Sequence, residues 1–256
     1  MATVTKPKES PLAGVEITSP DQIEYLNMLV YGEFGIGKTF LCGTAQDHPQ
    51  TSPILLLDIE GGTVTLRHRP DIEVVQVRNL GQLEKVHEQL RVNNNGHYRT
   101  VIIDSLSELA DLDMREVMRK MLQSRPDRDP DVADKREWGI VRTHMRKIVR
   151  AFKDLPMNTI MTTLLLQDKD DITGKTTFYP SLSGKMKTEI PGFFDVVGFM
   201  SSRVDGEEVT RSIQFLKTDK VTAKDRTSSF GSLLENPTIP MMWDLLHNNS
   251  KGTNTK

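Results

Sequence analysis

With 256 residues, the chain is long enough to bury a sizeable core, either as one large α/β domain or as two small ones. Its formal net charge of −2 and isoelectric point near 6.3 exclude a general attraction to nucleic acid, so such binding would depend on local basic segments. The single cysteine, Cys42, excludes an internal disulfide, and no run approaches the roughly 18 apolar residues of a membrane span, so we expect no membrane partner.

The first segment, residues 1–20, is polar and contains Pro7, Pro11 and Pro20, which favours a flexible arm. It lacks the apolar core of a signal peptide, so we expect a cytoplasmic protein. We place the folded domain at residues 21–247 and a disordered tail at residues 248–256.

Residues 25–39 have the pattern of a buried strand that runs into a glycine-rich loop and then into a helix at about residues 38–46. Gly32, four residues and Gly37-Lys38-Thr39 match the Walker A pattern, in which backbone N–H groups cradle phosphate. Lys38 can reach the β and γ phosphates, and Thr39 can offer its hydroxyl to Mg²⁺. The residues that we assign to nucleotide binding are Gly32, Glu33, Phe34, Gly35, Ile36, Gly37, Lys38, Thr39 and Phe40.

The apolar run at residues 54–57 predicts a parallel strand that is covered on both faces. It ends in Asp58-Ile59-Glu60-Gly61-Gly62, and ligands gather at the carboxyl ends of parallel strands. The acidic pair Asp58 and Glu60 is therefore a candidate for activating water. The alternative is a solvated turn whose carboxylates cap a helix.

A further strand at residues 73–77 and a helix at about 80–92 precede a hydrophobic strand that ends in Asp104, the Walker B form, whose carboxylate helps to bind Mg²⁺. The next residue is Ser105. Many ATPases that have Walker A and Walker B motifs carry at this position the glutamate that activates water. The base must therefore lie elsewhere, and Glu60 is the available candidate.

We expect helices at residues 109–123 and 135–153, separated by a charged loop at 124–131. A strand at residues 158–167 follows, and Gln167 at its carboxyl end can sense the γ-phosphate from the same crevice. The second helix has an apolar stripe that we expect to be buried, formed by Trp138, Val141, Met145, Ile148 and Phe152.

Residues 168–187 combine lysines with aromatic rings, a composition that suits a single nucleic-acid strand on a mobile loop. The alternative is an ordinary hairpin with a solvated lysine face. The residues concerned are Lys169, Lys175, Phe178, Tyr179, Lys185 and Lys187.

Residues 196–200 and 209–215 predict an antiparallel pair, and residues 220–226 continue its edge. The cations Lys224 and Arg226 could reach a neighbouring subunit's γ-phosphate or could merely protect an edge strand from aggregation. A closing helix is expected at residues 240–246. The sequence thus predicts an α/β fold with a mostly parallel sheet, helices on both faces and an antiparallel extension near the C-terminus.

The segments at residues 55–60, 74–77, 80–92 and 101–105 resemble the ATPase core of RecA-type recombinases. More closely, Asp58-Ile59-Glu60-Gly61-Gly62, Pro180-x-Leu182-x-Gly184-Lys185 and Lys224-Asp225-Arg226 resemble the core-only RecA-like ATPases encoded by bacteriophages, several of which act in single-strand annealing or recombination. The resemblance covers about residues 25–245.

This resemblance implies that ATP and Mg²⁺ are bound, that Glu60 activates water, and that Thr39 and Asp104 hold the metal. It also implies that Gln167 senses the γ-phosphate. In a homo-oligomer, either a ring or a filament, Lys224 and Arg226 would act in trans, with Lys185 as a second candidate. The segments at about residues 119–135 and 168–187 would line a DNA channel.

The leading hypothesis is a Mg²⁺-dependent ATPase that binds single-stranded DNA in phage recombination, annealing or replication. It would work in the bacterial host's cytoplasm, with a single-strand-binding or replication protein as a further partner. A second hypothesis is an ATPase of the same fold that drives a protein partner, as a loader, packaging motor or switch, without DNA contact. A third is a structural subunit with vestigial hydrolysis, against which the intact set Lys38, Thr39, Glu60 and Asp104 argues.

Overall fold

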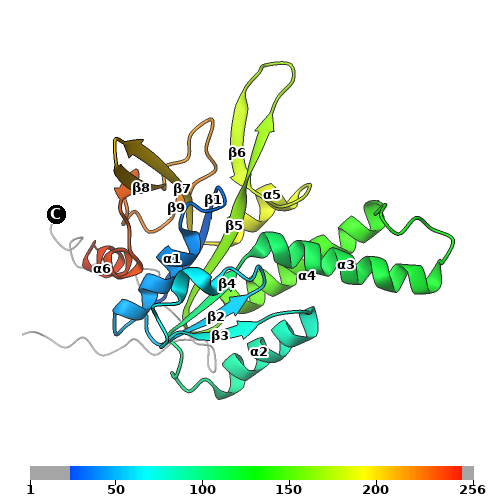
Figure 1. Cartoon of the computed structure of the whole chain (residues 1–256), viewed down its shortest axis with the longest axis horizontal. Coiled ribbons are helices and arrows are strands. Elements are labelled where there is room, and N and C mark those ends of the chain that lie inside the picture. The colour runs from blue at the N-terminus through cyan, green and yellow to red at the C-terminus, as the bar shows by residue number, and fades with distance from the viewer. Residues whose placement is uncertain (1–23, 250–256) are drawn as a thin grey trace, which may run out of the picture.

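The computed structural model describes residues 24–249, which form a ten-stranded sheet with helices packed on both faces (Figure 1). The strand order is β10-β8-β7-β1-β5-β4-β2-β3, while β6 pairs with β5 and β9 with β7. The strands are β1 (Asn27–Gly32), β2 (Ile54–Asp58), β3 (Glu73–Gln76), β4 (Thr100–Asp104), β5 (Asn158–Lys169), β6 (Thr176–Pro180), β7 (Val196–Asp205), β8 (Glu208–Gln214), β9 (Lys224–Asp225) and β10 (Leu233–Glu235).

The helices follow the expected positions with small shifts at their ends. Ser105 caps the third one, since its Oγ accepts a hydrogen bond from the N–H of Glu108, and this helix therefore begins earlier than expected. Within residues 24–249, no helix is long and apolar enough to cross a membrane. The α-helices are α1 (Lys38–Gly43), α2 (Leu80–Asn93), α3 (Leu106–Ser124), α4 (Lys135–Lys153), α5 (Met186–Glu189) and α6 (Ile239–Asn249), and the 3-10 helices are η1 (Thr44–Asp47), η2 (Thr63–Leu66) and η3 (Ile190–Phe193).

Two expectations concern the ends of the chain. The expected flexible arm, residues 1–20, lies outside the described residues. The expected tail begins inside α6, which runs to Asn249, so its first two residues are helical, and residues 250–256 lie outside the described part.

The expected α/β fold is confirmed. Strands β3, β2, β4, β5 and β1 are parallel, and β7 extends this order because it pairs in parallel with β1. Further along, β7 pairs antiparallel with β8, and β8 with β10, which forms the antiparallel extension. Since β5 lies between β1 and β4, the ends of all three strands meet at one edge of the sheet.

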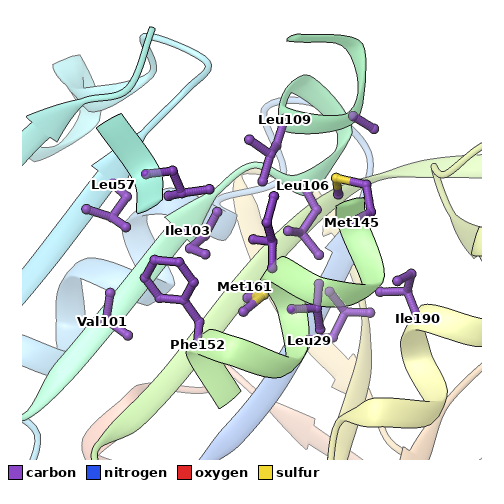
Figure 2. Packing of buried hydrophobic residues seen from close by; sticks show 14 of the residues in the cluster. Leu29, Leu57, Val101, Ile103, Leu106, Leu109, Met145, Phe152, Met161 and Ile190 are labelled. Carbon is purple, nitrogen blue, oxygen red and sulfur yellow. The ribbon is translucent and has the colours of Figure 1, made fainter. Parts of the chain in front are cut away.

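Alternation along the central strands divides the core between the two faces of the sheet. Leu29, Val101 and Ile103 belong to the cluster covered by α2, α3 and α4, whose packing around Phe152 and Met161 is shown in Figure 2. The intervening residues, among them Met28, Val30 and Ile102, pack against α1 and α6 on the other face. Because β1, β2 and β4 bury both faces, their sequences are mostly apolar.

The expected buried stripe of α4 needs one correction. Val141, Met145, Ile148 and Phe152 are buried, but Trp138 is 41% exposed. Trp138 lies in the first turn of α4, where it faces the loop at residues 130–133 across a cavity rather than the sheet.

The segment at residues 168–187 forms a hairpin, made by the end of β5 and by β6, and the start of α5. Strand β5 continues past the sheet to Lys169 and pairs with β6, so that the hairpin projects from the domain (Figure 1). At its tip, Oδ1 of Asp170 accepts hydrogen bonds from the N–H groups of Ile172 and Thr173 at 2.9 and 2.8 Å. These bonds give the turn a defined shape.

Candidate nucleotide-binding site

The loop between β1 and α1 has the backbone that its glycines predict. Gly35 and Gly37 have φ angles of 70° and 107°, in the left-handed region that favours glycine. A Cβ on Gly32 would lie 2.5 Å from the carbonyl oxygen of Met200, so a side chain there would clash with β7. The loop is thus held tightly against the end of the sheet.

Lys38 lies within this loop and is only 7% exposed. Its Nζ donates hydrogen bonds to the carbonyl oxygens of Gly32, at 3.0 Å, and Glu33, at 2.8 Å. Burial lowers the pKa of Lys38, while the negative charges of Asp104 and Glu60 act in the opposite direction. The ammonium is therefore held across the loop by carbonyls, whose place phosphate oxygens can take.

Asp104 and Thr39 supply the oxygen ligands that Mg²⁺ prefers. The Thr39 hydroxyl donates to Oδ2 of Asp104 at 2.6 Å, and the Thr162 hydroxyl of β5 donates to Oδ1. Asp104 is 4% exposed, so both hydroxyls orient a buried carboxylate. The pair Thr39 and Asp104 fits a hydrated Mg²⁺ that is held through few protein ligands.

Asp58, one member of the acidic pair, has a structural task. It is 2% exposed, Oδ1 accepts from the N–H of Gly61 at 2.7 Å, and Oδ2 accepts from Nε2 of Gln76 at 2.6 Å. Both oxygens are engaged, which shapes the turn after β2. Asp58 therefore does not fit the task of activating water.

Glu60, the other member, has an exposed side chain close to Asp104. The N–H groups of Ile59 and Glu60 donate to the carbonyl oxygen of Asp104 at 2.8 and 3.4 Å, which binds this turn to the end of β4. A Cβ on Gly62 would lie 3.9 Å from the Thr39 hydroxyl. Desolvation and the charge of Asp104 raise the pKa of Glu60, a change that makes its carboxylate a stronger base.

Gln167 lies three residues beyond the point where β5 is in register with the end of β1. Leu164 of β5 is in register with Gly32, the last residue of β1, whereas Gln167 pairs with Phe178 inside the projecting hairpin. Its side chain is exposed.

Lys224 and Arg226 lie toward the other edge of the sheet. Lys224 is in register with Val197 near the start of β7, while Met200 of the same strand is in register with Gly32. Three strand residues, roughly 10 Å, thus separate the two levels along the strand direction. This placement puts both cations away from the chain's own loop.

Both cations also have local partners. The Nζ of Lys224 donates to the carbonyl oxygens of Pro191 and Gly192, each at 3.2 Å, and Arg226 pairs with Asp195 at 3.4 Å. Burial and the positive charge of Arg226 lower the pKa of Lys224 to about 8.

A sequence model described as an AAA domain matches residues 24–227. The chain belongs to the AAA domain family. Membership supports the coarser part of the sequence-based hypothesis, a P-loop ATPase domain that uses nucleotide. No curated protein matches the chain.

Two solved structures are similar to this AAA domain. A KaiC-like protein, PH0186 from Pyrococcus horikoshii OT3, is 15% identical, with 82% of this chain and 88% of that chain covered and a TM-score of 0.44. The flagellar accessory protein FlaH from Methanocaldococcus jannaschii is 13% identical, with 84% and 88% covered and a TM-score of 0.44.

In the hairpin of this AAA domain, several side chains of the expected DNA site contact other protein groups. The Phe178 ring stacks on Phe199 with centroids 5.4 Å apart. Lys187 pairs with Asp168 and lies 4.9 Å from the centroid of the Tyr179 ring. Lys175 lies 3.7 Å from Asp219, whereas Lys169 and Lys185 are exposed and have no ion pair within residues 24–249.

Three residues of the site were missed by sequence reasoning: Thr162, Gln76 and Arg211. Thr162 has a weak signal, since Thr162-Thr163 interrupts an apolar strand and a buried hydroxyl needs a partner. Gln76 and Arg211 lie on strands whose pattern indicates nothing beyond a solvated face. Only strand order brings them to Asp58 and to the phosphate-binding loop.

Proposed function

We propose that this AAA domain is a Mg²⁺-dependent ATPase of RecA type in which Glu60 activates the attacking water, and that it binds single-stranded DNA. The proposal that this domain hydrolyses ATP rests on the different surroundings of three carboxylates. Asp58 and Asp104 are buried and engaged by hydrogen bonds, whereas Glu60 is exposed beside Lys38 and Asp104 with a raised pKa.

The chain's own groups cover the needs of phosphoryl transfer. Lys38 would exchange its loop carbonyls for phosphate oxygens and neutralise charge there, and Glu60 would accept the proton of the water. Thr39 and Asp104 would hold Mg²⁺, which, when bound, neutralises charge on the phosphates. Glu60 needs its deprotonated form for this task.

A second copy of the chain would complete the site. Large apolar side chains are exposed around the phosphate-binding loop: Phe34 is 87% exposed, Phe40 53% and Val64 72%. Such a group on a monomer surface marks an interaction site. A neighbouring subunit would cover it and bring Lys224 and Arg226 to the nucleotide, in a ring or a filament.

The projecting hairpin supports DNA binding. Ile172 at its tip is 96% exposed, on a turn that Asp170 holds in shape. Proteins that bind DNA insert such apolar side chains between bases and contact the backbone with nearby cations. Lys169 and Lys185, both exposed, are the cations suited to that task. Such binding fits recombination, annealing or replication of phage DNA in a bacterial host's cytoplasm, with a single-strand-binding or replication protein as a further partner.

The experiment is ATP turnover with and without single-stranded DNA, at low and moderate salt, with Lys38→Ala as the inactive control. We expect DNA to stimulate turnover at low salt and less so at moderate salt, because phosphate contacts weaken with salt. Ile172→Asp and the pair Lys169→Ala with Lys185→Ala should each remove the stimulation and leave basal turnover.

A matched pair, Lys85→Ala with Lys147→Ala, makes the same change of charge at exposed positions on α2 and α4 and should behave as the wild type. The hairpin would be excluded as the DNA-binding site by either of two results. DNA could still stimulate turnover in the hairpin variants, or the matched pair could lose the stimulation to the same extent.

A second candidate, an ATPase that drives a protein partner without DNA contact, is favoured by a cavity of about 660 Å³ beside α3. Met114, Met118, Leu122, Val132 and Trp138 are among its lining residues. An apolar cavity of this kind suits a protein side chain better than a phosphate backbone. ATP turnover that is the same with and without DNA at every salt concentration would favour this second candidate over DNA binding.

A further inference from the structure

Arg211 of β8 contacts the phosphate-binding loop, although no sequence motif assigns it a role. Its Nε donates a 3.0 Å hydrogen bond to the carbonyl oxygen of Ile36. A Cβ on Gly37 would lie 3.1 Å from the same Nε, so the side chain also packs closely against the loop. A residue from the antiparallel extension thus supports the Walker A motif.

The backbone of Arg211 is itself well anchored. Its N–H donates to Oδ1 of Asn236 at 3.1 Å, and the N–H of Asn236 donates to the carbonyl oxygen of Arg211 at 2.6 Å. In addition, Arg211 is in register with Ser202 of β7. The guanidinium therefore extends toward the loop from a fixed base.

The hydrogen bond determines which way one peptide of the loop faces. In a trans peptide the N–H and C=O point in opposite directions, so a bond from Arg211 to Ile36 turns the N–H of Gly37 away from Arg211. That N–H makes no hydrogen bond to another residue within 24–249 and is free to meet an anion. Gly37, with its φ of 107°, restricts its own peptide little, so an outside contact decides the orientation.

We propose that Arg211 is a positioning residue for nucleotide binding, which holds the Ile36–Gly37 peptide so that the N–H of Gly37 is presented to a nucleotide phosphate. The inference rests on the nucleotide binding proposed above. Within residues 24–249, Arg211 has no acidic partner, so its charge strengthens the bond to the Ile36 carbonyl.

Three substitutions separate the hydrogen bond from the charge. Arg211→Gln places a neutral N–H donor at the same number of bonds from Cα as Nε. Arg211→Met keeps an unbranched side chain without a donor, and Arg211→Lys keeps the positive charge on an ammonium one bond farther from Cα than Nε. The probe is fluorescent mant-ADP, whose Kd is measured by titration, together with kcat and KM for ATP.

We expect Arg211→Met to raise the Kd of mant-ADP and the KM of ATP about tenfold, the size typical of a lost hydrogen bond to a charged donor. Arg211→Gln should remain within about threefold of the wild type. The kcat at saturating ATP should change less than about twofold in both, since the loss affects ground state and transition state alike. A purely structural role would give no rescue by glutamine.

Arg203→Met is the matched control, because Arg203 is exposed on the neighbouring strand and pairs with Thr210, so its side chain faces the other side of the ribbon. It should leave Kd unchanged. An unchanged Kd in Arg211→Met would overturn the inference. So would retention by lysine with loss by glutamine, which would indicate direct contact of the charge with phosphate. A wild-type protein that fails to bind mant-ADP would instead overturn the proposed function itself.

Discussion

Asp58, Glu60 and Asp104 lie at the ends of adjacent strands, but their surroundings give them different tasks. Asp58 shapes the turn after β2 through Gly61 and Gln76, and Asp104 is oriented by two hydroxyls. Desolvation and, to a smaller extent, the charge of Asp104 raise the pKa of Glu60. The chemical role of each carboxylate therefore depends on which of its oxygens remain free of hydrogen bonds.

Glu60→Gln should therefore abolish turnover without weakening nucleotide binding. General-base catalysis contributes about 10² to 10⁴-fold, so we expect a loss of kcat of that size with an unchanged Kd for mant-ADP. Single-turnover hydrolysis and equilibrium titration are the two measurements. A Glu60→Gln variant that still turns over ATP within about threefold of the wild type would exclude Glu60 as the base.

The lowered pKa of Lys224 predicts that ATP turnover falls at alkaline pH. Its pKa is lowered to about 8, so it loses its charge as the pH rises through that value. If the charge acts on a neighbour's phosphates, kcat should fall above about pH 8. Lys224→Arg stays charged, so the fall should move to higher pH in a pH profile of kcat. Identical alkaline limits in the two proteins would show that another group titrates.

The apolar stripe of helix α4 contains residues that lie in two different surroundings. Phe152 near its end is 1% exposed and packs beneath β4 and β5, as Figure 2 shows, whereas Trp138 in its first turn borders a cavity and is 41% exposed. The same helical period therefore carries a core residue and a surface aromatic residue.

Alanine substitutions on α4 should differ in cost accordingly. Phe152→Ala should lower the free energy of unfolding by about 3–5 kcal/mol, because it leaves a cavity in the core. Trp138→Ala should cost less than about 1 kcal/mol, as is usual for surface positions. Urea denaturation measures both, and Phe152→Leu replaces the alanine variant if that does not fold. Equal costs would contradict the placement of Trp138.

For the whole molecule, the arrangement of the sheet separates the two halves of the proposed active site. The phosphate-binding loop follows the carboxyl end of β1, while Lys224 and Arg226 flank the start of β7. A cation that serves the reaction from there must reach a neighbouring copy. The exposed Phe34, Phe40 and Val64 mark where that copy would dock.

A mixing experiment tests this arrangement. Glu60→Gln and Lys224→Ala should each be inactive alone, but together they should regain part of the wild-type turnover, because some interfaces then combine an intact Glu60 with an intact Lys224. The mixture is compared with each variant at the same total concentration. A mixture no more active than its components would exclude a role of Lys224 in trans.

The sequence by itself determined the elements whose evidence is local. The Walker A spacing predicts the loop from Gly32 to Thr39, and Asp104 ends its strand as expected. The helix at residues 135–153 is found with the bounds that its apolar period and charges predict. In each case, spacing, turn chemistry and periodicity act over a few residues.

Only the tertiary structure decided which side chains are free at the site. In the folded chain Asp58 accepts a hydrogen bond from Gln76, β5 extends into a hairpin that includes Gln167, Trp138 is exposed, and Arg211 contacts Ile36. These outcomes depend on contacts between segments far apart in the chain. Local pattern reports that a face is apolar or polar, but strand order and packing determine what lies against it.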